Sequence, residues 1–220
     1  MARASDTAYA AIKDLIQRGE IPPGQTIDEA ATAKTLGISR TPVREALLRL
    51  QAERFVEIGK GKGIRVAPLS SSDMREMYQV ISGLEVAAVA LLTRRRPSRD
   101  DLAELVDETR RMEAAIVADD VDAWGEADER FHRALMRLSG NRKLYEVGCQ
   151  MRDFVLRAHR VALRLQTPDY RTASTANHAK LIEALLAPEH AFATDAHYNQ
   201  RLRGEEALVG VVEKYRINSL

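Results

Sequence analysis

Two small sets of residues have the types and the spacing that chemistry requires. Arg40, Thr41 and Arg44 are close in sequence, and on a helix they fall within one arc of about 100°. An arginine at the start of such a helix can hold a guanine edge through two parallel hydrogen bonds. In a second segment Asp128 and His132 are four residues apart, so a helix places their carboxylate and imidazole on one face.

The second set is expected to point into the protein core. Asp128 and His132 share their helical face with Trp124, and a buried carboxylate and imidazole are costly unless they are paired or bind something. They make half of a metal site. His178 lies on the apolar face of another expected helix, and His197 is a fourth candidate by composition. The alternative is a buried Asp128–His132 pair and ordinary hydrogen-bonded core histidines.

The arginines need a helix to present them, and the N-terminal pattern provides it. Apolar residues recur with helical spacing over 7–17 and 28–37, and Ser39 is a good cap for a third helix that follows. Two helices joined by a brief turn that contains Gly37 form a helix-turn-helix. The arginines stand at the start of its second helix, where recognition helices contact bases.

A change of period follows the third helix. Residues 55–58 and 64–66 are short β-prone runs, and glycines alternate with Lys60 and Lys62 between them. The pattern predicts a hairpin with a lysine-bearing tip, the shape and charge of a DNA-binding wing. A helix-turn-helix followed at once by such a hairpin indicates DNA binding far more specifically than either motif alone. The alternative is that the arginines lie on an ordinary solvated helix face.

Each residue that we expect to contact DNA either lies on this helix or hairpin or carries a positive charge that can bind phosphate. They are Lys34, Ser39, Arg40, Thr41, Arg44, Arg49, Lys60, Lys62 and Gly63.

The remainder of the chain is expected to be all α. Pro68 and the serines that follow it mark a boundary, so we expect a DNA-binding domain over 1–68 and a helical domain over 69–220. The fold class is therefore mainly α, with a small hairpin wing and an antiparallel bundle. The expected bundle helices are 73–94, 99–118, 121–138, 142–165, 172–186 and 189–214.

Composition sets further bounds. The chain is 45% hydrophobic and 30% charged with a net charge of +1, and the first 68 residues carry 11 Lys/Arg against 8 Asp/Glu. No apolar run long enough for a membrane span and no signal sequence is recognisable, so we expect a cytoplasmic protein with no membrane partner. The single cysteine, Cys149, can form no internal disulfide.

The helix-turn-helix resembles a known family. Gly37-Ile38-Ser39-Arg40-Thr41-Pro42-Val43-Arg44-Glu45-Ala46-Leu47 looks like the signature of GntR-family regulators, and the likeness continues to Gly63-Ile64-Arg65-Val66. The resemblance implies a homodimer on a palindromic double-stranded operator. Two positions depart from the pattern: Ala30 replaces an arginine that contacts DNA in many members, and Arg54 replaces a glycine after the third helix.

The second half resembles the FCD effector domain of the FadR subfamily. The string Asp128-Glu129-Arg130-Phe131-His132, followed by Ser139-Gly140-Asn141, looks like its central motif. The resemblance implies a divalent metal, often zinc or nickel, beside a pocket for a small carboxylate or sugar acid, and no organic cofactor. It assigns Asp128, His132 and His178 as ligands; the last ligand position falls near Gln200, with His197 one turn earlier.

The same resemblance outlines an effector pocket, for which we expect Tyr78, Ile81, Glu85 and Trp124. Ile81 stands where many members have an arginine, so the effector is expected to be less anionic than usual or to be held chiefly through the metal. His159 is expected to have only a structural role.

These observations predict a sequence-specific transcription regulator. We expect a repressor of metabolic genes whose operator affinity changes when a small metabolite binds in the bundle, and we expect no enzymatic activity. The alternatives are a metal-dependent hydrolase that uses the Asp/His site and a nonspecific architectural DNA-binding protein.

Overall fold

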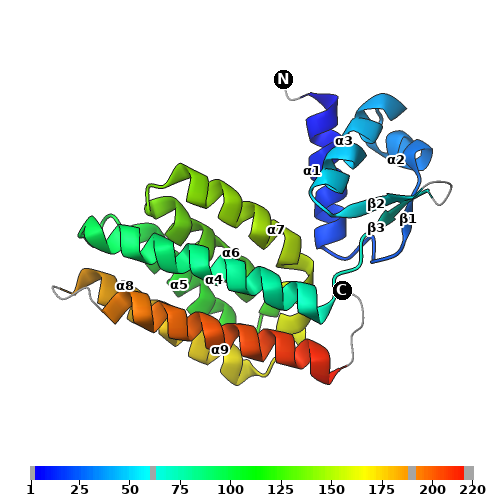
Figure 1. Cartoon of the computed structure of the whole chain (residues 1–220). Helices are drawn as coiled ribbons and strands as arrows, with labels where there is room; N and C mark the ends of the chain where they lie inside the picture. Colours follow the sequence, from blue (N-terminus) through cyan, green and yellow to red (C-terminus); the bar gives the residue numbers. More distant parts are fainter. Residues whose placement is uncertain (1–2, 60–62, 188–191, 216–220) are drawn as a thin grey trace. The chain divides into compact units, whose positions relative to one another are not determined.

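The computed structural model describes residues 3–59, 63–187 and 192–215. The chain divides into two compact units, both drawn in Figure 1. Of the described residues, the first unit takes those up to Ser70 and Asp153–Ala158, and the second takes Ser71–Arg152 and those from His159 on. The expected boundary after residue 68 lies two residues before the first of these divisions.

The first unit contains the expected helix-turn-helix. Its helices are α1 (Ala4–Gln17), α2 (Glu29–Leu36) and α3 (Arg40–Ala52). Asp28 caps α2 by accepting a hydrogen bond from the Ala31 amide, and Gly37 ends it in the left-handed conformation, with φ 66°. Ser39 is the residue before α3, as expected, but its side chain makes no capping hydrogen bond.

A three-stranded antiparallel sheet completes this unit. Its strands are β1 (Thr26–Ile27), β2 (Val56–Gly59) and β3 (Gly63–Val66), and β3 lies between the other two. Ile64 pairs with Ile27 on one side and Ile58 on the other. The hairpin was expected, whereas β1 was not, because two residues give no recognisable period.

The core of the first unit comes from the faces that helical spacing predicted. Ile12 and Ile16 of α1 and Val43 and Leu47 of α3 are fully buried. Arg54 lies just after the end of α3 and has φ 61°. The left-handed conformation explains why a glycine is usual at this position, since a side chain there is strained.

The second unit is a helical bundle, as expected, and no strand occurs among its described residues. Its helices are α4 (Ser71–Arg94), α5 (Ala103–Val117), α6 (Val121–Leu138), α7 (Arg142–Leu165), α8 (Pro168–Leu186) and α9 (Ala193–Lys214). The bounds of α6 and α7 agree with those predicted. The helix α5 begins four residues later than expected, whereas α8 begins four residues earlier because Pro168 occupies its first position.

Local capping fixes the helix that matters most for the site. Asp120 accepts a hydrogen bond from the Ala123 amide at the start of α6, and Asn141 does the same for Leu144 at the start of α7. Gly140 makes the turn between them with φ 77°. The start and end of α6, and therefore the face it buries, are set by short-range hydrogen bonds.

Packing then turns that face inward. The helix α4 lies beside α9, and α5 lies beside α6 (Figure 1). Trp124, Phe131 and Leu135 of α6 are fully buried. By length and composition α4 could also cross a membrane, but its contacts with α6, α8 and α9 make it a helix of this bundle.

Candidate nucleic-acid interface and metal centre

The start of α3 presents its polar residues to solvent. Ser39, Arg40, Thr41 and Arg44 are all exposed, while Val43 between them is buried in the core. Neither arginine forms an ion pair with any residue in the described part of the chain. Two free guanidinium groups at a helix N-terminus suit a partner that is anionic and offers hydrogen-bond acceptors, as a DNA groove does.

Other expected DNA contacts are distributed around this helix. Lys34 of α2 is exposed, and Gly63 opens β3 with φ 73°. Lys60 and Lys62, at the expected tip of the wing, lie outside the described residues.

Arg49 differs from the other expected contacts. Its guanidinium stacks on the Tyr9 ring, 3.7 Å from the ring centroid, and lies 3.4 Å from Asp6 and 3.6 Å from Glu53. An arginine held this way joins α3 to α1. Its contacts are therefore those of a structural residue, although its side chain is 53% exposed.

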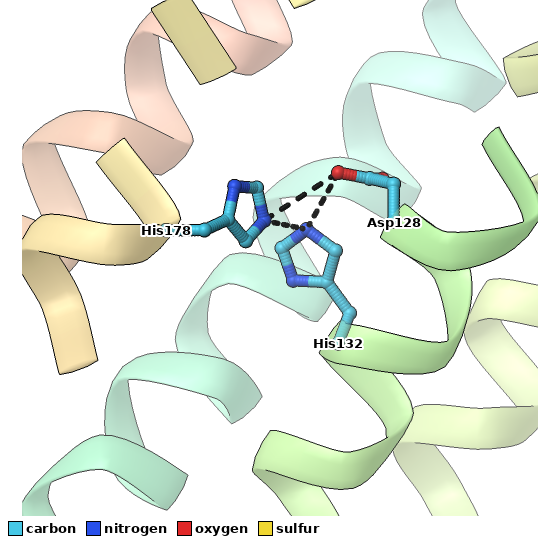
Figure 2. A group of neighbouring side chains, drawn as sticks. All are labelled: Asp128, His132 and His178. Atoms are coloured by element: carbon cyan, nitrogen blue, oxygen red, sulfur yellow. Dashed lines mark hydrogen bonds and ion pairs between the residues drawn. The ribbon is translucent and has the colours of Figure 1, made fainter. Parts of the chain in front are cut away.

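In the bundle the expected carboxylate and two imidazoles come together. Figure 2 shows Asp128 and His132 on α6 facing His178 on α8. The Nε2 atoms of the two histidines are 3.3 Å apart, and they lie 3.7 Å (His132) and 3.4 Å (His178) from Asp128 Oδ1. All three side chains are buried. A metal about 2.1 Å from each ligand in a tetrahedral site separates its ligand atoms by about 3.4 Å, so this triangle matches one face of such a site.

Each ring has an oxygen beside its Nδ1 atom. His178 Nδ1 donates to the Ser174 carbonyl oxygen over 2.6 Å, which leaves the lone pair of a neutral ring on Nε2. His132 Nδ1 lies 3.0 Å from Glu85 Oε2, off the ideal N–H direction. Two lone pairs and a carboxylate oxygen thus converge on one point, an arrangement that a cation stabilises.

The protonation states agree with this geometry. Burial lowers the pKa of His132 to about 3 and also lowers that of His178, so both rings are neutral at neutral pH. Burial alone would raise the pKa of Asp128, but the surrounding histidines hold it below its usual value. Neutral imidazoles and an ionised carboxylate are the forms in which these groups bind metals.

Neither candidate for the last ligand joins this group. His197 is buried on α9, and its Nε2 lies 3.2 Å from Glu85 Oε2. Gln200 is half-buried and lines cavities between α8 and α9. Among the described residues, the donor atoms that gather within 4.8 Å are those of Asp128, His132 and His178.

The residues expected to form the effector pocket are all buried. Ile81 and Trp124 have no exposed surface, and the Trp124 indole donates to Thr175 Oγ1 over 2.9 Å. The Tyr78 hydroxyl lies 2.5 Å from His159 Nδ1. Burial raises the pKa of Tyr78 well above its usual value, so its hydroxyl keeps its proton.

The Glu85 carboxylate contacts side chains from three other helices. Besides His132 and His197, its carboxylate contacts Arg152 Nη1 at 2.8 Å and Arg201 Nε at 3.4 Å. Burial alone would raise its pKa, but Arg201 and the neighbouring histidines hold it well below the usual value. Glu85 is therefore an ionised carboxylate with no exposed surface.

Sequence reasoning missed three residues at this site. Arg152 and Arg201 are buried against Glu85, and Arg201 Nη1 also lies 3.5 Å from His132 Nε2. His159 was expected to be only structural, yet its Nε2 lies 3.6 Å from Asp128 Oδ2. The available signal was weak: each lies on the inward face of a helix, but a long arginine normally extends to solvent.

Comparison with known proteins gives consistent matches. Residues 76–198 match the family described as the FCD domain, and residues 4–66 match the family described as bacterial regulatory proteins, gntR family.

Individual relatives carry related descriptions. An uncharacterized HTH-type transcriptional regulator from Agrobacterium vitis is 41% identical over 59% of this chain and 77% of its own length. The gluconate operon transcriptional repressor of Bacillus subtilis is 27% identical over 80% of this chain and 73% of its own length. Among solved structures, McbR of Escherichia coli superposes with a TM-score of 0.80 at 22% identity, covering 98% of this chain and all of that one.

Proposed function

The chain belongs to the GntR family of bacterial regulatory proteins and carries an FCD domain, so it is a DNA-binding transcription regulator and not an enzyme; from this premise we propose that it is a cytoplasmic, ligand-responsive repressor. The hydrolase alternative has no support, because the matching families and relatives are regulators. Relatives described as repressors include the gluconate operon protein and GlaR of Escherichia coli.

The observation that carries the proposed DNA reading is the pair of exposed, unpaired guanidinium groups at the start of α3. Arg40 and Arg44 read base edges, while Ser39 and Thr41 contact phosphate oxygens and so position the helix. Lys34, Lys60 and Lys62 add backbone contacts that raise affinity without carrying sequence information.

A homodimer would place two such helices on a palindromic operator. The surface that supports it is on α4, which is apolar over more of its circumference than the bundle covers. Val80 is 48% exposed, and Leu84 and Leu91 are half-buried. Apart from its chain neighbours and the nearby backbone of α4 itself, nothing lies within 4 Å of where a Gly83 side chain would begin. We assign this face to contact with a second copy, since two-fold symmetry pairs one surface with itself.

The bundle would hold a divalent metal, zinc or nickel, through Asp128, His132 and His178. When bound, the ion supplies a Lewis-acidic position for a ligand oxygen. The three protein donors leave at least one position for an effector. Glu85 and the Ser174 carbonyl orient the imidazoles by holding their Nδ1 sides.

The effector would be a small organic acid. Ile81 stands where many family members have an arginine, so that guanidinium is missing here. Arg201 of α9 supplies another, with its Nη1 3.5 Å from His132 Nε2. A cation beside a metal position favours an anion between them, because a carboxylate oxygen can bind the ion and accept from the guanidinium. Ligand binding in the bundle would then shift the population of dimers able to hold both operator halves.

One experiment tests the regulatory proposal. Footprinting of the full chain on the DNA upstream of its own gene is repeated with a panel of small carboxylic and sugar acids. We expect a palindromic protected region, and protection that weakens with one acid. Uniform protection of any DNA would establish nonspecific binding and overturn the proposal.

A second experiment tests the metal. Elemental analysis of protein purified without chelator should give close to one zinc or nickel per chain. Asp128→Asn should lower that content strongly, while Glu126→Gln, an exposed change on the same helix, should not. Equal metal content in the two variants would refute the assignment.

A further inference from the structure

A groove that carries both apolar and polar side chains lies between α8 and α9. It consists of two adjoining cavities of about 290 and 220 Å³ that share Asn177, Gln200 and Arg203 in their linings. Cavities of this size approach the lower end of the range that holds small molecules. The groove is distinct from the group of Asp128, His132 and His178, none of which lines it.

The charge of the groove has one sign. Arg203 and Lys180 line it, and no carboxylate occurs among its described lining residues. Two other cations on these helices are neutralised, since Arg171 pairs with Asp119 and Arg201 contacts Glu85. Lys180 and Arg203, by contrast, form no ion pair with any described residue.

The rest of the lining offers hydrogen bonds in both directions. Asn177, Asn199 and Gln200 supply carboxamides, and Ser174 supplies a hydroxyl. Carboxamides both donate and accept, so they match hydroxyl groups as well as acid oxygens. This set of groups differs from an ordinary solvated helix surface, where acids and bases alternate.

A buried imidazole with one unsatisfied ring nitrogen lies at this groove. His197 lines the larger cavity but is only 1% exposed, and its Nδ1 has no hydrogen-bond partner. Its other nitrogen is occupied by Glu85 at 3.2 Å. A buried, unsatisfied polar atom is unfavourable, and a ligand group in the groove could satisfy it.

We propose that this α8–α9 groove is a second small-molecule site, for an anion that carries a carboxylate or phosphate together with hydroxyl groups. Arg203 and Lys180 bind the acid group, and the carboxamides bind the hydroxyls. His197 connects the site to the bundle core, because the imidazole that lines the groove also contacts the Glu85 carboxylate, which lies 3.0 Å from His132 Nδ1. Occupancy of the groove and of the metal site would therefore influence each other.

The sequence has only five histidines, which makes the test specific. Full-length protein is labelled with ¹³C in its histidine rings, and chelator removes any metal so that the probes cannot bind an ion at Asp128. The His197 signal is assigned from its loss in His197→Gln. Inorganic phosphate and acetate are then titrated separately, against sodium chloride of equal ionic strength.

We expect a saturable shift of the His197 signal with at least one probe, and the responding probe identifies the acid group. The double change Lys180→Gln with Arg203→Gln should weaken that binding about tenfold or more, since it removes two charge-assisted contacts. Arg99→Gln, another exposed and unpaired cation of the bundle, should leave it unchanged.

Two results would overturn the proposal: shifts no larger than those with chloride, or a saturable shift that survives the double change. Both are independent of DNA binding and of metal content, so they separate this site from the proposed regulatory function.

Discussion

The same side chain has opposite environments in the two units of this protein. Arg40 and Arg44 of the first unit are exposed and unpaired, whereas Arg152 and Arg201 of the second are buried around the Glu85 carboxylate. A free surface guanidinium keeps its hydrogen-bond donors available for an external partner. A buried one must be neutralised within the fold, because an unpaired charge is costly away from water.

The comparison indicates which residues can be changed to alter DNA binding without altering the bundle, and which cannot. Changes to the outward arginines should affect a partner and leave the fold intact. Changes to the inward charges should affect the fold before any partner, because each charge balances several others. The following predictions test this contrast, from the largest expected effect to the smallest.

Removing the central carboxylate should have the largest effect. Glu85→Ala leaves Arg152 and Arg201 buried without their shared partner, and breaking such a buried pair costs about 3–5 kcal/mol. Urea unfolding followed by the fluorescence of Trp124, the single tryptophan and fully buried in the bundle, measures this loss. Glu126→Ala, whose side chain is 61% exposed, is the control and should change stability by less than about 0.5 kcal/mol. Equal losses of stability in the two variants would show that the buried charges do not stabilise the bundle.

Acid should unfold the bundle. Burial alone would raise the pKa of Glu129, but Arg152 and Arg133 lower it to about 2, against an unfolded value near 4.3. Because the unfolded state binds more protons between these values, the stabilisation is complete above about pH 4.3 and is lost as pH falls toward 2. For this group alone the loss is about 3 kcal/mol.

Trp124 fluorescence between pH 5 and 2 measures that transition. Glu126→Gln should not move its midpoint, since that carboxylate is exposed. A bundle signal that stays native to pH 2 would contradict the expected dependence.

Arg44→Ala should weaken operator binding by about 1–3 kcal/mol, the value of one bidentate contact to a base, with no loss of stability. Fluorescence anisotropy with operator and scrambled DNA gives the ratio of the two affinities, which should fall. Lys34→Ala should instead weaken both DNAs alike and reduce the dependence on salt. A retained affinity ratio in Arg44→Ala would refute its role in base reading.

Arg54→Gly should have the smallest effect, and it should stabilise. Arg54 has φ 61°, and relief of the left-handed strain is expected to contribute about 1 kcal/mol. Gly37→Ala, at φ 66°, should do the opposite by a similar amount. Amide hydrogen exchange in the full chain measures both, at the end of α3 for Arg54→Gly and at the end of α2 for Gly37→Ala. Exchange that fails to slow in Arg54→Gly, or fails to quicken in Gly37→Ala, would contradict the expected strain at that position.

Much of the architecture was predictable because it depends on local periodicity. Asp120 and Asn141 mark helix starts that the structure bears out by hydrogen bonds to amides three residues on. The two strands of the hairpin were likewise evident from a change of period. The two-residue strand β1 was not, because it is defined only by its pairing with β3.

The sequence by itself determined the types and helical faces of the key residues: two arginines at a helix start, and a carboxylate four residues before an imidazole. Those relations follow from the geometry of one helix. Tertiary packing alone decided that His178 meets His132, that His197 turns to Glu85, and that Arg152 and Arg201 point inward. The physical reason is that these contacts join residues on different helices, and their energies depend on burial and on neighbours distant in the chain.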